Sequence, residues 1–116
     1  MATPAMPSPK LHLPPDYPIE EAAERGYMNH ALVELGPDKL YPVYFSTQWR
    51  VQNELDAMIP HGEPFIIETG LIVVREITLA NLEAAVAKAL AAGWFEYQVP
   101  LTRARVDAAD PFHWPP

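Results

Sequence analysis

The sequence LIVVREITLANLEAAVAKALAAG, residues 71–93, contains the two clearest secondary-structure signals of the chain. The run LIVV is apolar on both faces, which is typical of a central strand covered from both sides, so we expect a strand over 71–77. Thr78 can cap the helix that follows, over 79–92, and Gly93 suits the position just after its end. The predicted buried stripe of this helix consists of Leu79, Leu82, Val86 and Leu90.

Further strands are expected on both sides of this unit. Residues 65–68, followed by a Thr69-Gly70 break, predict a hairpin with 71–77. Residues 94–101 alternate, with Glu96 and Gln98 on the polar side, which indicates a half-buried edge strand. Its predicted inward positions are Phe95, Tyr97, Val99 and Leu101.

A second amphipathic helix is predicted over 47–59, capped by Ser46 or Thr47. Trp49 falls on its polar side, and a tryptophan there is costly to leave in water and typical of interface hot spots. We therefore expect Trp49 to be covered by another part of the chain or by a partner. The predicted buried stripe of this helix is Val51, Leu55, Met58 and Ile59.

The preceding segment predicts a short helix over 18–25 and then a hairpin. The strands of that hairpin, 31–35 and 40–45, are separated by Gly-Pro-Asp-Lys. Pro42 has no N–H to donate, so the second strand should lie at a sheet edge or contain a bulge.

These elements together predict the α+β class. The expected fold is a small, mainly antiparallel sheet in hairpin-helix-hairpin-helix-strand order, with helices on one face. The chain has 116 residues, which is enough for one domain, and we place that domain at 18–106.

Proline-rich arms are expected on both sides of this domain, at 1–17 and 107–116. The chain has 14 prolines, concentrated near its two ends. Because proline cannot donate a backbone hydrogen bond, these segments should be extended and contribute no core position. Their apolar side chains predict docking to a partner: Leu11, Leu13, Tyr17, Phe112 and Trp114.

The charge distribution excludes several function classes. The net charge of −7, from 15 acidic and 8 basic residues, argues against binding to nucleic acid or to an anionic membrane surface. No run of about 18 apolar residues occurs. The first residues lack a stretch of the signal-peptide type, so a cytoplasmic location is expected.

Catalytic, cofactor-binding and metal-ligating residues are not predicted. The chain has no cysteine, and its four histidines lack the i, i+4 spacing of a helical metal site. Its two serines, Ser8 and Ser46, are outside any nucleophile motif, and its five glycines are too widely spaced for a phosphate loop.

Three functions are compatible with these features. The first is a non-enzymatic protein-binding module, such as an accessory subunit or an immunity- or antitoxin-like neutraliser, which uses Trp49 and the arm residues. The second is a small enzyme or small-molecule-binding domain with a pocket between sheet and helices. The third is a structural homo-oligomer that pairs through the 94–101 edge strand. In the small enzyme or small-molecule-binding domain, the polar groups of the pocket would come from Tyr41, Tyr44, Glu68, Arg75 or Glu76.

Overall fold

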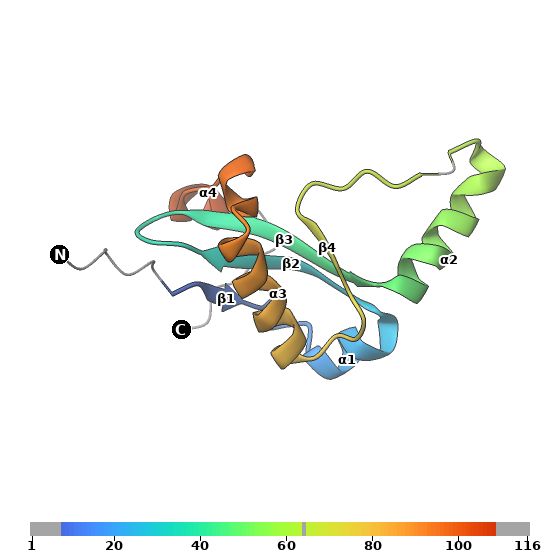
Figure 1. Cartoon of the computed structure of the whole chain (residues 1–116), viewed down its shortest axis with the longest axis horizontal. Coiled ribbons are helices and arrows are strands. Elements are labelled where there is room, and N and C mark those ends of the chain that lie inside the picture. The colour runs from blue at the N-terminus through green and yellow to red at the C-terminus, as the bar shows by residue number, and fades with distance from the viewer. Residues whose placement is uncertain (1–7, 64, 109–116) are drawn as a thin grey trace.

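Four strands in the described part of the computed structural model form one sheet, in the order β1-β2-β3-β4. The structure describes residues 8–63 and 65–108. β1 (Lys10–His12), β2 (Tyr27–Glu34) and β3 (Leu40–Thr47) pair antiparallel, and β4 (Leu71–Val74) pairs with β3 in parallel. The predicted α+β class with mainly antiparallel pairing is therefore confirmed (Figure 1).

The two longest helices begin where the sequence predicts. The hydroxyl oxygens of Thr47 and Thr78 accept hydrogen bonds from the backbone N–H groups of Arg50 (3.4 Å) and Asn81 (3.1 Å), and so cap the helices that follow. The helical segments are α1 (Ile19–Arg25), α2 (Gln48–Met58), η1 (Ile59–His61), α3 (Leu79–Ala91), η2 (Trp94–Tyr97) and α4 (Arg103–Ala108).

The hydrophobic core lies between α3 and one face of the sheet, with α1 beside it (Figure 1). Leu82 and Val86, two residues of the predicted stripe of α3, are buried there. Core positions alternate along the strands, because successive side chains of a strand point to opposite faces. The buried residues of this cluster are Ala22, Met28, Ala31, Val33, Leu35, Tyr41, Val43, Phe45, Val74, Ile77, Leu82, Val86 and Phe95.

Residues 8–17 are part of the fold. β1 pairs with the outer edge of β2, and Leu11 and Leu13 pack against the core. Tyr17 also packs there, and its hydroxyl donates to the Tyr27 carbonyl at 3.1 Å. For residues 8–17, the expectation of no contribution to the core is therefore wrong. Residues 10–13 contain no proline, so their N–H groups remain free to pair with a neighbouring strand.

Residues 94–101 do not form the predicted edge strand. Gly93 adopts a left-handed conformation at the end of α3, and the next residues turn into η2. The N–H groups of Glu96 and Gln98 bond to the carbonyls of Gly93 and Phe95, both at 3.1 Å, so these local bonds replace a strand ladder. In this stretch, Leu101 alone makes a β-bridge, with Leu40. A homo-oligomer through a 94–101 edge strand therefore has no structural basis.

The predicted hairpin of 65–68 with 71–77 is also absent. Residues 65–68 are not in a strand, and β4 lies at the sheet edge beside β3. The N–H of Tyr44 donates to the Gly70 carbonyl at 2.9 Å, and Gly70 lies directly against the Pro42 carbonyl. The expectation that 71–74 is covered on both sides fails at Val73, which is exposed.

Pro42 occupies a local edge of β3, as its missing N–H predicts. The N–H groups of Leu40 and Tyr44 point away from β2 and donate to Leu101 and Gly70. Pro42 lies between them, where β4 has not yet begun. A residue with an N–H at this position would leave that donor without a strand partner.

Leu82→Ala tests the core placement of α3. Its side chain is fully buried, so we expect a loss of about 2–5 kcal/mol in the free energy of unfolding. Leu79→Ala on the same helix is the matched control. Because Leu79 is 49% exposed, its replacement should lower the free energy of unfolding clearly less. Urea unfolding measures both variants, and equal losses would contradict this placement.

Removal of residues 8–17 tests whether the N-terminal segment is structural. A chain that starts at Pro18 loses β1 and the core contacts of Leu11, Leu13 and Tyr17. We expect its melting temperature to fall clearly below that of a chain that starts at Ser8. Equal melting temperatures would show that the segment is a dispensable arm.

Candidate functional site

α2 extends away from the sheet instead of packing on it (Figure 1). None of its residues is buried, although it has an apolar stripe of the same kind as α3. Val51, Leu55 and Met58 are half-buried, and Ile59, just after the helix, is 59% exposed. The predicted burial of this stripe is therefore wrong, because the described chain places no second layer over it.

A groove runs between α2 and the returning segment 65–68, and it is called the α2 groove below. It encloses about 440 Å³. Phe65 and Ile67 are exposed beside it, Ile67 at 86%. Its lining residues are Glu54, Ala57, Met58, Glu63, Phe65, Ile66, Ile67 and Glu68. The groove thus combines apolar side chains with three carboxylates.

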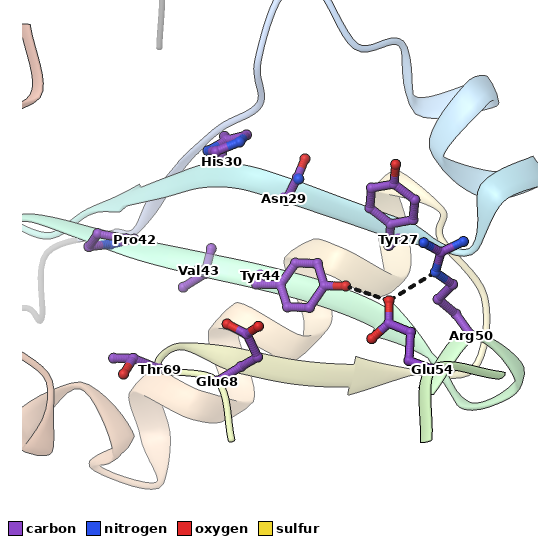
Figure 2. A pocket seen from close by; sticks show the side chains of 10 residues that line it. All are labelled: Tyr27, Asn29, His30, Pro42, Val43, Tyr44, Arg50, Glu54, Glu68 and Thr69. Carbon is purple, nitrogen blue, oxygen red and sulfur yellow. Dashed lines mark hydrogen bonds and ion pairs between the residues drawn. The ribbon is translucent and has the colours of Figure 1, made fainter. Parts of the chain in front are cut away.

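A second hollow, of about 500 Å³, lies on the sheet face opposite α3, where α2 meets β2 and β3 (Figure 2). We call it the tyrosine hollow. Figure 2 shows Arg50 and Glu54 reaching from α2 toward the rings of Tyr27 and Tyr44. Glu68 and Thr69 complete the opposite wall. The lining residues are Tyr27, Asn29, His30, Pro42, Val43, Tyr44, Arg50, Glu54, Glu68 and Thr69.

Glu54 connects the polar groups on one side of the tyrosine hollow. Its carboxylate accepts from Arg50 Nε at 3.0 Å and from the Tyr44 hydroxyl at 3.5 Å. The Arg50 guanidinium lies 4.5 Å from the centre of the Tyr27 ring, a cation–π geometry. The Tyr27 and Tyr44 rings are 6.5 Å apart. One aromatic ring and one carboxylate thus contact the guanidinium, and the carboxylate links it to Tyr44.

Burial and nearby carboxylates perturb the tyrosine hydroxyls. Partial burial raises the pKa of Tyr44, and the carboxylates of Glu54 and Glu68 raise it further. Burial and the neighbouring Tyr27 raise the pKa of Tyr17 to about 12. Both phenols therefore stay protonated at neutral pH and act as hydrogen-bond donors.

A bulge in β2 forms the far rim of the tyrosine hollow. The register with β3 shifts between Met28 and Ala31, and His30 adopts a positive φ of 60°. Positive φ is uncommon for residues other than glycine. The bulge places Asn29 and His30 along the hollow (Figure 2).

The two hollows form one continuous surface, because Glu54 and Glu68 line both. Their joint lining carries three carboxylates, of Glu54, Glu63 and Glu68, and one guanidinium, of Arg50. The surface therefore combines apolar side chains with an excess of carboxylates.

The predicted partner-binding residues lie in different places. Trp49 is 48% exposed, and its indole lies against Gly26, so its own chain covers about half of it. Its role in partner binding stays a prediction. Leu11, Leu13 and Tyr17 are engaged with the core. Phe112 and Trp114 are outside the described residues.

The residues weighed for a small-molecule pocket separate in a similar way. Tyr44 and Glu68 do meet, in the tyrosine hollow. Tyr41 is buried in the core, whereas Arg75 and Glu76 follow β4 on the surface and do not line either hollow.

Sequence reasoning missed Tyr27, Arg50 and Glu54. The i, i+4 spacing of Arg50 and Glu54 on a predicted helix indicates an ion pair and was available as a signal. Tyr27 carried no such signal, because the prediction began its strand only at residue 31.

Residues 8–63 and 65–108 hold no group of three or more potential metal ligands. None of their helices has the length and apolar character needed to cross a membrane. Comparisons with protein-family models, curated proteins and solved structures found no match.

Gly26→Ala tests the packing of Trp49. Gly26 has a φ of 81°, which costs a non-glycine residue about 1–3 kcal/mol. An added Cβ would also overlap the Trp49 indole and lie 2.7 Å from Thr47 Oγ1. Gly62→Ala is the matched control, because Gly62 has a φ of 75° and open space around it. We expect Gly26→Ala to lower the free energy of unfolding more than Gly62→Ala; equal losses in urea would refute the contact.

Proposed function

We propose that this chain is a non-enzymatic protein-binding module, such as an accessory subunit of a larger assembly or a neutraliser of the immunity or antitoxin type. The observation that carries the proposal is α2. An amphipathic helix without a buried residue projects from the sheet, and the segment after it exposes Ile59, Phe65 and Ile67. Phe65 and Ile67 both line the α2 groove, and exposed apolar side chains gathered in one place are typical of protein interaction sites.

The α2 groove supplies the recognition surface in this proposal. Its apolar residues, Met58, Phe65, Ile66 and Ile67, come from two segments that face each other. A groove of this shape suits an extended or helical segment of a partner, which would fill it with apolar side chains. The tyrosine hollow shares two of its residues with the groove, so we assign it to the same partner rather than to a separate small molecule.

A partner of another kind fits this surface better than a second copy of the chain. The joint lining of the two hollows has more carboxylates than cations, and the whole chain carries a charge of −7. Pairing of two such surfaces would bring like charges together, which costs binding energy. We therefore expect a hetero-complex.

Ile67→Ser tests this proposal by removing an apolar side chain from the α2 groove. The tagged full-length chain is used to capture proteins from its native cell, and captured proteins are quantified by mass spectrometry. Because Ile67 is 86% exposed, the variant should keep the wild-type melting temperature but lose its specific partner. Val99→Ser is the matched control, since Val99 is 82% exposed and lies outside both hollows.

Two results would reject the proposal. One is retention of every captured protein by Ile67→Ser. The other is a stable dimer of the wild-type chain by sedimentation that Ile67→Ser dissociates, because the groove would then serve self-association.

A further inference from the structure

The tyrosine hollow already holds one cation, and its contacts show how such a group is accommodated. The Arg50 guanidinium lies over the Tyr27 ring at 4.5 Å and pairs with Glu54 at 3.0 Å. Aromatic faces and carboxylates attract cations by independent electrostatic effects, and together they bind a guanidinium well.

The other wall of the hollow repeats these two components. Tyr44 presents a second ring, and Glu68 a second carboxylate, whose field reaches the Tyr44 hydroxyl. Among the described residues, Glu68 makes no ion pair. Tyr44 is half-buried and Glu68 is exposed, so this wall is open to a group from outside.

We propose that the partner segment that docks in the α2 groove is amphipathic and basic, and that one of its arginine or lysine side chains enters the tyrosine hollow between Tyr44 and Glu68. This inference rests on the proposed function and adds the chemistry of the partner. It follows from the continuity of the two hollows, because Ile67 lines the apolar end and the adjacent Glu68 lines both. A partner would therefore present its apolar and basic side chains close together.

Charge and geometry together disfavour the other occupants. A second copy of the chain would add three more carboxylates to a surface that already has an excess of them. Among the described elements, β1 and α4 are nearest the ends of the chain, and both lie at the end of the molecule opposite the tip of α2 (Figure 1). The partner chemistry that complements the surface is apolar and positively charged.

Three synthetic peptides test the inference on the full-length chain. The first is an amidated 12-residue amphipathic peptide of leucine and arginine. In the second, citrulline replaces arginine and keeps its shape without its charge; in the third, glutamate replaces it. We expect the arginine peptide to bind at least tenfold more tightly than the citrulline peptide and the glutamate peptide not to bind, as measured by fluorescence anisotropy.

Glu68→Gln tests whether an arginine side chain of the peptide lies beside Glu68 in the tyrosine hollow. Exposed ion pairs contribute up to about 1 kcal/mol, so this variant should weaken binding of the arginine peptide about three- to fivefold. Glu83→Gln is the matched control, since it removes the same charge from an exposed position on α3 and should leave the affinity unchanged. Equal weakening by both variants would mean general charge attraction and would overturn the inference.

The remaining outcomes separate this inference from the proposed function. If the arginine and citrulline peptides bind equally and Ile67→Ser weakens the binding of both, the groove binds apolar segments. The inference that the partner must be basic is then wrong. If the arginine peptide does not bind while Ile67→Ser still abolishes partner capture, the partner has another chemistry and the inference is overturned. If Ile67→Ser affects neither peptide binding nor capture, the proposed function fails as well.

Discussion

The parallel pairing of β4 with β3 is the constraint on which the functional surface depends. Antiparallel neighbours can be joined by a tight turn, whereas parallel strands need a long crossover connection. Here the connection runs over residues 48–70 and contains α2, η1 and the segment that returns to β4. Gly70 closes it, because its left-handed φ of 79° and missing side chain allow β4 to approach the backbone of Pro42. Without this approach, β4 and the segment before it would not lie beside β3.

A helix in a crossover connection usually covers a face of the sheet, but α2 does not. α3 and α1 already cover one face, and α4 covers part of the other through Val106, which packs on Leu32 and Leu40. α2 is attached at its beginning, through the Thr47 cap and the contacts of Arg50 and Glu54 with the tyrosines. Its apolar stripe therefore remains available, and the α2 groove and the tyrosine hollow meet at Glu54 and Glu68.

Predictions from the sequence succeeded where a signal was local. The helices capped by Thr47 and Thr78 begin as expected, and Pro42 occurs where β3 lacks a strand neighbour on the side away from β2. They failed where two different parts of the chain could satisfy the backbone hydrogen bonds of the same segment. Residues 94–101 alternate like a strand, but the turn that starts at Gly93 satisfies their backbone locally. The segment before Pro18 has the composition of an arm, yet the open edge of β2 recruits residues 10–12.

The sequence by itself determined the class, the positions of α1, α2 and α3 and the acidic character, because these follow from periodicity, capping and composition. Of the five residues that it offered for a pocket, Tyr44 and Glu68 do line one hollow. Only the tertiary structure decided which amphipathic helix is covered. Both α2 and α3 have an apolar stripe at helical spacing, yet Leu82 of α3 is buried and no residue of α2 is. Periodicity reports that a helix has an apolar face, whereas burial of that face depends on whether another layer reaches it. For α2, we propose that this layer comes from a partner.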